Sequence, residues 1–176
     1  AAAMPQAAAP EAQAIVIDTE TTGLTDSDEL LQISVIDDAG TVLFDSLERP
    51  YFHTEWPQVQ KVNGITPEMV AGAPYPHELL PQLVEIFSEM SVCIGYNTSF
   101  DLGFLDRIGV PTEHLTVIDV MQRFVDYLNA NGGTHRRASL STCTKYFDYK
   151  WEGTAHNSLT DAKATLYCYN MMKVIK

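Results

Sequence analysis

The sequence is poor in basic residues: 11 Lys and Arg stand against 23 Asp and Glu, which gives a formal net charge of −12. This charge opposes non-specific binding to nucleic acid and to anionic membrane surfaces. The composition therefore argues against a protein that coats nucleic acid, and any contact with nucleic acid must be local. A bound metal ion would cancel part of the charge if the carboxylates cluster.

Cysteine is also scarce. Cys93, Cys143 and Cys168 are an odd number without C-x-x-C spacing, which predicts reduced cysteines in the core. No apolar run approaches the roughly 18 residues of a membrane span, and the Ala- and Pro-rich start lacks the regions of a signal peptide. These absences predict a cytoplasmic protein without membrane contact. No internal repeat is visible.

With 176 residues, of which 45% are hydrophobic, the chain is long enough for one domain with a single core. Residues 1–13 are low in complexity and have no periodic apolar face, which indicates a linker or a remnant of cloning. The domain is expected to span residues 14–176. Met4 follows three alanines, which is compatible with a domain cut from a longer protein.

Hydrophobic periodicity predicts the elements of this domain. Strands are expected at 14–17, 30–36, 41–47, 92–96 and 116–118. Helices are expected at 67–71, 76–90, 99–108, 119–129, 139–147 and 158–174, with a surface loop at 48–65. An antiparallel meander followed by alternating helices and strands indicates an α/β, three-layer domain of ribonuclease-H-like type, with a mixed five-stranded sheet flanked by helices.

The first candidate site follows the opening strand, in the segment A-I-V-I-D-T-E-T-T-G-L of residues 14–24. Side chains alternate along a strand, so Asp18 and Glu20 point the same way. Two carboxylates this close require a cation, and a hard divalent ion is the natural occupant. Residues 21–23 turn the chain and offer hydroxyls and amides at the same rim. Acidic pairs on exposed strands are common, so other segments must supply further ligands.

The second candidate site is N-T-S-F-D-L-G-F-L, residues 97–105, after the fourth strand. Asp101 lies in the first helical turn, where the helix dipole favours a carboxylate. Phe104 and Leu105 turn the same side of the helix toward the core and hold Asp101 at the sheet rim. Alternatively, Asp101 is an ordinary acid at a helix start. Asn97 either ends the strand or offers its amide to a substrate.

The third candidate site is H-N-S-L-T-D-A, residues 156–162. His156 precedes a helix on a loop, whereas Asp161 is fixed in the first turn. A mobile base beside a fixed metal ligand suits the activation of water. Alternatively, Ser158 and Asp161 form an S-x-x-D capping signal and His156 is only a loop residue.

In order and spacing, D-T-E-T-T-G-L, N-x-x-F-D-x-x-F-L and H-x-x-x-x-D-A resemble the three motifs of the DEDDh family. These are the DnaQ-like 3′-5′ exonucleases, typified by the proofreading subunit of bacterial DNA polymerase III. Two further segments, residues 63–70 and 117–120, also resemble the family. The chain departs from residues that are frequent in the family at Asn63, Tyr96, Val120 and Ser158, none of which is a predicted ligand.

The resemblance implies a metal-dependent 3′-5′ exonuclease that removes nucleoside 5′-monophosphates from the 3′ ends of single-stranded or frayed DNA. It implies a general base, His156, and two Mg²⁺ or Mn²⁺ ions held by the four acids Asp18, Glu20, Asp101 and Asp161. It further implies a set of residues that contact the last nucleotide: Thr21, Thr22, Gly23, Leu24, Asn97 and Phe100. Leu24 would wedge against the base; alternatively, it is tucked over the sheet.

The basic run at His135, Arg136 and Arg137 stands out in an acidic chain. We expect Arg136 and Arg137 to bind phosphates of the substrate strand, although a short basic run is also typical of a solvated loop. Two alternative functions remain. One is a 3′-5′ exoribonuclease, against which the D-T-E-T form of the first motif favours DNA. The other is a recruited module tethered to a polymerase, a helicase or a CRISPR adaptation complex.

Overall fold

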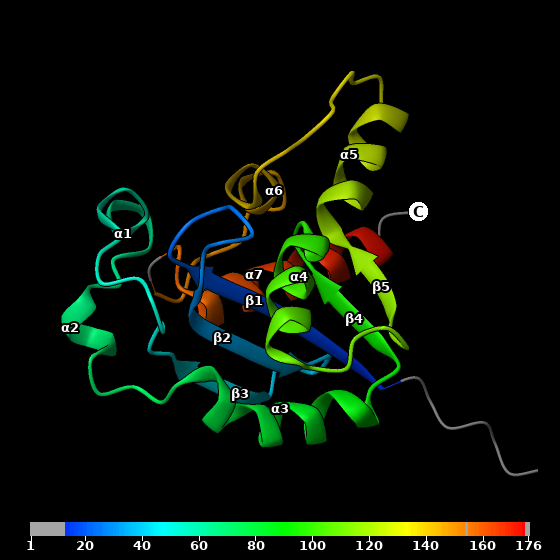
Figure 1. Ribbon diagram of the computed structural model, residues 1–176. Helices are drawn as coiled ribbons and strands as arrows, with labels where there is room; N and C mark the ends of the chain where they lie inside the picture. The colour runs from blue at the N-terminus through cyan, green and yellow to red at the C-terminus, as the bar shows by residue number, and fades with distance from the viewer. Residues whose placement is uncertain (1–12, 154, 175–176) are drawn as a thin grey trace, which may run out of the picture.

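The computed structural model describes residues 13–153 and 155–174 (Figure 1). Its strands are β1 (Ala14–Thr21), β2 (Leu30–Asp37), β3 (Val42–Leu47), β4 (Val92–Gly95) and β5 (Thr116–Asp119). Its helices are α1 (Pro57–Asn63), α2 (Pro67–Val70), α3 (Pro76–Glu89), α4 (Thr98–Ile108), α5 (Val120–Ala130), α6 (Leu140–Tyr146) and α7 (Ser158–Val174). Apart from Gln13, the predicted linker at 1–13 lies outside the described residues.

The strands form one sheet in the order β3-β2-β1-β4-β5. The first three strands are the predicted antiparallel meander, and β4 and β5 run parallel to β1. Because the carboxyl ends of parallel strands meet at the same edge of a sheet, the ends of β1 and β4 lie together. The predicted mixed five-stranded sheet flanked by helices is confirmed.

Alternation along β1 directs its side chains to two separate cores. Ile15 and Ile17 pack against α3 and α4, whose largest contributions are Phe87 and Leu105. Val16 packs on the other face against residues of α5, α6 and α7. Figure 1 shows α3 and α4 in front of the sheet and α7 behind it, which makes three layers. A strand covered on both faces explains the unbroken apolar run before Asp18.

Two differences from the sequence prediction exceed a single residue at an element's end. The opening strand does not end at Ile17 but continues through Asp18 and Glu20 to Thr21. The surface loop predicted at 48–65 is wrong in its second half, because Pro57–Asn63 is helical. Pro57 starts this helix, and Gly64 ends it in the left-handed conformation at φ 71°. The two residues that indicated a loop are therefore the start and stop signals of a short helix.

The residues that flank α1 belong to a small third core, although the helix itself buries none of its side chains. The Trp56 indole nitrogen donates to the Ile65 carbonyl at 2.7 Å, and both side chains pack with Leu31 and Val70. The predicted state of the cysteines is confirmed, since Cys93, Cys143 and Cys168 are buried and unpaired. Among the described residues, none of the helices has the combined length and apolar character that crossing a bilayer requires.

Glu48 is a buried acid at the end of the meander. Its amide donates to the Leu31 carbonyl, its side chain is fully buried, and neither carboxyl oxygen has a hydrogen-bond partner among the described residues. Burial raises the pKa of Glu48 from 4.5 to about 8. The folded state therefore binds this proton more tightly than the unfolded chain. The corresponding stability is present below pH 4.5 and is lost as the pH rises through about 8.

We expect the Glu48→Gln variant to be more stable than the parent at mildly alkaline pH, by roughly 2 kcal/mol, because no buried carboxylate has to form. The difference should shrink as the pH falls. Urea unfolding across this pH range measures both effects, with Glu55→Gln as the control because Glu55 is exposed. An identical pH dependence in Glu48→Gln and the parent would contradict the assignment.

Candidate active site

Three of the four predicted acids come together at the end of β1. Asp18 and Glu20 point to the α7 face of the sheet, where they meet Asp161 from the first turn of α7. One carboxylate oxygen from each of the three lies within 4.8 Å of the others, and all three side chains are partly buried. This geometry agrees with the prediction that Asp18 and Glu20 point the same way, which holds because β1 continues past Asp18.

Asp101 reaches the same edge from the opposite face. It is buried on α4, and the Thr19 hydroxyl donates to its Oδ1 at 2.7 Å. Thr19 points away from Asp18 and Glu20, so its bond draws Asp101 toward the α4 side of the strand. Within the described residues, Asp101 stands outside the group of three. Its charge nevertheless acts on Asp18.

The electrostatics of the cluster reflect burial and mutual repulsion. Burial raises the pKa of Asp18 well above its usual range, and the charges of Asp101, Asp161 and Glu20 raise it further. Burial followed by the Asp161 charge raises the pKa of Glu20 to about 8. Burial also raises the pKa of Asp101 to about 7, despite the Thr19 bond, and that of Asp161 to about 6. None of the ion pairs among the described residues includes these four acids.

A divalent cation fits this donor set. The donors are carboxylate oxygens only, which are the ligands that Mg²⁺ and Mn²⁺ prefer over softer sites. Acids that repel one another in a partly buried site are stabilised by a positive charge between them. Asp18, Glu20 and Asp161 can therefore bind a divalent ion, and Asp101 adds a fourth carboxylate from α4.

A polar ladder on β2 docks the helix that carries Asp161. Ser34 and Gln32 lie opposite Asp18 and Glu20 in the antiparallel register. The hydroxyls of Ser34 and Ser158 are 2.6 Å apart, and the Gln32 side-chain oxygen accepts from the Ser158 amide at 3.3 Å. Sequence reasoning missed these two β2 residues. Their signal was polar character at alternate positions in the otherwise apolar strand L-L-Q-I-S-V-I-D.

His156 lies beside Asp161 on the loop before α7, as the sequence indicates. Its amide donates to Asp161 Oδ1 at 3.1 Å, and its side chain is exposed. The Ser158 hydroxyl contacts Ser34 in the sheet, so the capping role predicted for Ser158 is not observed. Asp161 does accept an amide of the loop just before α7, as the same alternative predicted for the start of this helix.

Two residues next to the site have left-handed backbones. Asn97 has a φ of 63° and His156 a φ of 64°, and they precede the helices that carry Asp101 and Asp161. The Asn97 amide donates to the Asp119 carboxylate at 3.0 Å, which holds the turn from β4 into α4. Left-handed non-glycine residues cost free energy and cluster at functional sites. Asp119 was not predicted to support the site.

The loop after β1 uses the hydroxyls that the sequence analysis expected to be offered at the rim. Thr21 donates to the Gly23 carbonyl at 2.6 Å. Thr22 donates to Asp28 at 3.1 Å and accepts from the Glu29 amide at 2.9 Å. Both threonines are buried and use their hydroxyls in hydrogen bonds that shape the loop.

Gly23 and Leu24 form the outer part of this loop. A Cβ on Gly23 would lie 2.4 Å from Asp28 Oδ1, so only glycine lets Asp28 close the loop from beneath. Leu24 is 81% exposed, and the alternative in which it is tucked over the sheet is wrong. An exposed leucine at the tip of a fixed loop is available to contact a ligand.

The remaining predicted residues lie around this centre. Phe100 is partly buried on α4 and packs against Phe104, with ring centroids 5.1 Å apart. Arg136 and Arg137 are exposed on the loop between α5 and α6, which projects from the sheet in Figure 1. The structure does not bring these two arginines into the acidic group.

Asn63 is a site residue that sequence reasoning did not assign. It ends α1, its side-chain amide lies 3.5 Å from the Thr21 carbonyl, and its hydrogen bond lowers the pKa of Glu20 against the larger effects of burial and Asp161. The sequence signal for Asn63 was the N-G-I-T-P segment. Because α1 was not predicted, nothing indicated that this segment lies beside β1.

A family model described as exonuclease, of the ribonuclease T type, matches residues 15–169. The chain belongs to the exonuclease family. This exonuclease chain is 29% identical over 163 residues to the PolC-type DNA polymerase III of Caldanaerobacter subterraneus, covering 88% of its own length and 11% of the polymerase. It is also 29% identical over 169 residues to the uncharacterized exonuclease CP81 of Escherichia phage 186, covering 86% of this chain and 84% of the phage protein.

Solved structures share the fold of this exonuclease chain. E. coli exonuclease I in complex with a dA16 oligonucleotide superposes with a TM-score of 0.76 at 18% identity, covering 93% of this chain and 41% of that one. Exonuclease X in complex with 5′ overhanging duplex DNA gives a TM-score of 0.65 at 22% identity and covers 92% of both chains. The predicted family and the ribonuclease-H-like fold are confirmed.

The acidic cluster of the exonuclease chain predicts a specific response to a metal. In EDTA, Asp18→Asn should raise the stability at mildly alkaline pH by about 1–3 kcal/mol, because the raised carboxyl pKa values mean that stability is lost as the pH rises. Mn²⁺ should raise the melting temperature of the parent but not that of Asp18→Asn. Thermal unfolding with and without Mn²⁺ measures both.

The matched control is Asp38→Asn, which changes an exposed acid in the β2–β3 turn and should leave both melting temperatures unchanged. A lower melting temperature of Asp18→Asn in EDTA, or equal stabilisation of parent and variant by Mn²⁺, would contradict the account of the cluster.

Proposed function

We propose that this domain is a divalent-metal-dependent 3′-5′ exonuclease that removes nucleoside 5′-monophosphates from the 3′ ends of single-stranded or frayed DNA. The observation that carries the proposal is the convergence of Asp18, Glu20 and Asp161, with oxygens within 4.8 Å of one another. Membership in the exonuclease family supports it. The names of relatives and neighbours, among them a DNA polymerase III and an exonuclease bound to an oligodeoxynucleotide, favour DNA.

The proposed metal ligands are Asp18, Glu20, Asp101 and Asp161, which would hold two Mg²⁺ or Mn²⁺ ions. Asp18 is the proposed bridge, because it groups with Glu20 and Asp161 and the charge of Asp101, from the opposite face, also acts on it. Bound divalent ions lower the pKa of water and neutralise charge on a phosphodiester. The chain supplies the fixed carboxylates, and Thr19 and the Ser34–Ser158 contact orient them.

His156 is the proposed general base. An imidazole titrates close to neutral pH and can take a proton from an attacking water. The amide bond from His156 to Asp161 keeps the backbone beside the acids, while the exposed ring is free to turn toward a substrate. The proton would leave through this ring to solvent.

The substrate contacts are proposed on both sides of the acids. Leu24 and the Gly23 backbone would meet the last nucleotide, on a loop whose shape Thr21 and Thr22 set. A second group borders the pocket or binds the phosphates of the strand: Asn97, Phe100, Arg136 and Arg137. The exposure of Leu24 and of the two arginines supports these contacts.

The chain spans 11% of the length of the first polymerase relative, which favours a role within a larger DNA-processing polypeptide or assembly. Such a role would add to catalysis and not replace it, because a purely recruited module has no need of the five proposed catalytic residues. A 3′-5′ exoribonuclease would share every proposed metal ligand and would differ only where the 2′-hydroxyl is contacted.

Direction, product and metal requirement can be tested together. On a 5′-labelled oligonucleotide we expect a ladder of shortened strands, and on a 3′-labelled one the immediate release of a labelled mononucleotide. EDTA should abolish both. Asp18→Ala should be inactive, and His156→Ala should lose about 10²–10⁴-fold in kcat, as expected on removal of a general base.

Glu85→Ala, which removes an exposed acid from α3, is the matched control and should keep full activity. Circular dichroism of all variants shows whether the domain still folds. Immediate release of the 5′ label as a mononucleotide, before a ladder appears, or undiminished activity of either site variant, would refute the assigned roles.

Substrate preference requires a separate experiment. Digestion of single-stranded DNA and RNA of the same sequence should be faster for DNA, because the proposed contacts include no hydrogen-bonding group assigned to a 2′-hydroxyl. Single-turnover rates of the two strands are compared under identical metal concentrations. Equal or faster digestion of RNA would overturn the preference for DNA and leave the metal site untouched.

A further inference from the structure

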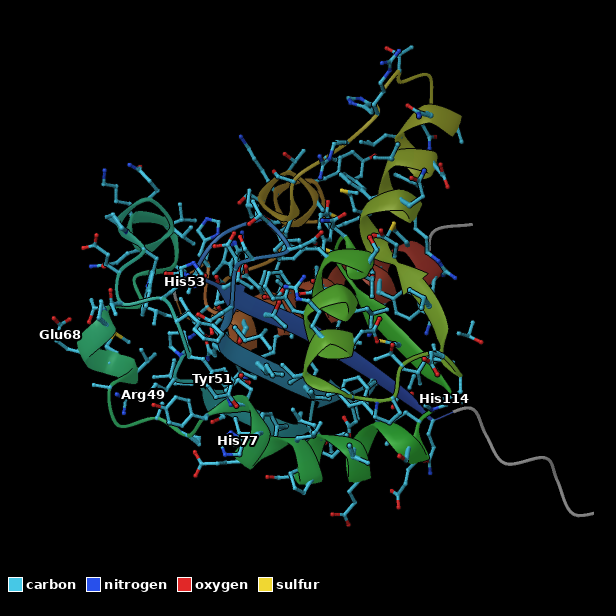
Figure 2. All side chains as sticks on the ribbon, in the orientation of Figure 1. Arg49, Tyr51, His53, Glu68, His77 and His114 are labelled. Carbon is cyan, nitrogen blue, oxygen red and sulfur yellow. The ribbon has the colours of Figure 1, made fainter. Side chains whose placement is uncertain are left out.

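The segment R-P-Y-F-H, residues 49–53, brings aromatic and cationic side chains together in an acidic chain. It follows β3 and lies against the start of α3. We name as the aromatic surface the set of Arg49, Tyr51, Phe52, His53, Tyr75 and His77. Figure 2 shows Arg49, Tyr51, His53 and His77 gathered on the side of the molecule where α2 and the start of α3 lie.

Three rings of this surface are nearly parallel. The centroids of Tyr51 and Tyr75 are 5.0 Å apart at an interplanar angle of 11°, and His77 lies 6.0 Å from each at 20° and 18°. The Tyr51 hydroxyl and His77 Nδ1 are 2.6 Å apart, which fixes the stack. The Arg49 guanidinium lies 5.2 Å from the Tyr75 centroid. A cation thus lies over one ring of the stack.

Two of these rings are exposed far more than core packing would require. Phe52 is 86% exposed and Tyr51 is 48% exposed. They form a ridge between two hollows. One, of about 230 Å³, is lined by Arg49, Tyr51 and Tyr75; the other, of about 460 Å³, is lined by Tyr51, Phe52 and Arg107. Exposed aromatic rings beside hollows are typical of binding surfaces.

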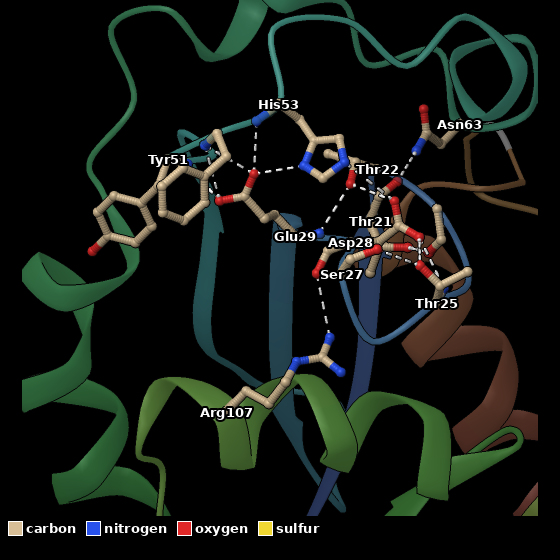
Figure 3. A network of polar contacts seen from close by, with 12 residues as sticks. Thr21, Thr22, Thr25, Ser27, Asp28, Glu29, Tyr51, His53, Asn63 and Arg107 are labelled. Atoms are coloured by element: carbon tan, nitrogen blue, oxygen red, sulfur yellow. Dashed lines mark hydrogen bonds and ion pairs between the residues drawn. The ribbon is translucent and has the colours of Figure 1, made fainter.

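The backbone beneath the ridge is rigidly held. The Glu29 carboxylate accepts the amides of Tyr51, Phe52 and His53 at 2.6, 3.0 and 2.8 Å, as Figure 3 shows, and it also contacts His53 Nδ1 at 2.7 Å. Burial would raise the pKa of Glu29, but these hydrogen bonds outweigh it and lower the pKa. The Glu29 carboxylate is therefore bound to backbone amides, while the rings of Tyr51 and Phe52 are exposed.

The aromatic surface adjoins the loop that the proposed function assigns to the 3′ nucleotide. His53 Nε2 lies 3.5 Å from Asp28 Oδ1, and the same carboxylate receives the Thr22 hydroxyl and packs beneath Gly23. One histidine thus connects the ridge to the loop that ends in Leu24.

We propose that the aromatic surface is a second contact for single-stranded nucleic acid, on which bases 5′ to the nucleotide in the active site stack. This inference rests on the proposed function. A single strand is the occupant because the exposed rings can stack on its bases and the Arg49 guanidinium, which lies over Tyr75, can bind a phosphate. The net charge of −12 adds a reason, since it leaves the chain dependent on local contacts of this kind.

The test measures binding of a fluorescent single-stranded oligonucleotide by anisotropy in EDTA, where it is not digested. We expect Phe52→Ala to weaken binding about tenfold, the loss typical of one stacked base, and Phe52→Tyr to keep the parent affinity. The matched control is Val174→Ala, which removes an equally exposed apolar side chain (79%) at the end of α7 and should bind like the parent.

A strand with abasic sites 5′ to its last nucleotides shows whether the bases make the contact. The parent should bind it about as weakly as Phe52→Ala binds the intact strand, and Phe52→Ala should lose nothing further. Unchanged binding of the intact strand by Phe52→Ala, or an equal loss on both strands, would overturn the proposal. Thermal unfolding of each variant establishes that it is folded.

Failure of the proposed function is recognised separately, with a substrate that has no upstream bases. The parent should hydrolyse the p-nitrophenyl ester of thymidine 5′-monophosphate in the presence of Mn²⁺. Absence of this hydrolysis would refute the proposed function, whatever the binding results. Hydrolysis by the parent together with normal oligonucleotide binding by Phe52→Ala would refute the aromatic surface alone.

Discussion

Repulsion between the carboxylates at the end of β1 is the constraint on which the rest of the structure depends. Burial and mutual charge both raise the pKa of Asp18, so the cluster opposes folding unless a cation or protons compensate it. The fold holds the acids in place from two sides. Thr19 draws Asp101 to the strand from α4, and the Ser34–Ser158 contact fixes α7 on the other face. Supporting contacts of this kind are expected at functional sites, where acids are held together although their repulsion opposes folding.

Further hydrogen bonds of this kind fix the loop that follows β1. Asp28 closes the turn around Gly23 and Thr22, and hydrogen bonds from Thr25 and Thr22 together with His53 lower its pKa although burial raises it. Glu29, the next residue, fixes the segment that carries Phe52. Two adjacent acids therefore connect the candidate active site with the aromatic surface. Bound strands would meet a surface that is already ordered, which reduces the entropy lost on binding.

The sequence predicts the parts of this site that depend on local chemistry. Alternation along a strand placed Asp18 and Glu20 on one face, and helix-start signals placed Asp101 and Asp161 in first turns. The structure agrees on each of these positions. The resemblance of the motifs gave the family, which no single motif could have given.

What the sequence could not predict depends on contacts between distant segments. Helix α1 was missed because Pro57 and Gly64 signal both loops and helix ends, and only packing of Trp56 decides between them. The Thr22 hydroxyl donates to Asp28, six positions further along the chain, a contact that no local sequence pattern predicts. The roles of Gln32 and of Glu29, which holds the aromatic surface, likewise could not be predicted before the contacts between distant segments were known.

The central claim is that four carboxylates from three separate segments enclose divalent ions. The most direct measurement is the anomalous difference map of a crystal soaked in Mn²⁺. The account predicts strong peaks between Asp18, Glu20, Asp101 and Asp161, with Asp18 contacting each ion. Peaks elsewhere on the molecule, with these four side chains turned apart, would contradict it.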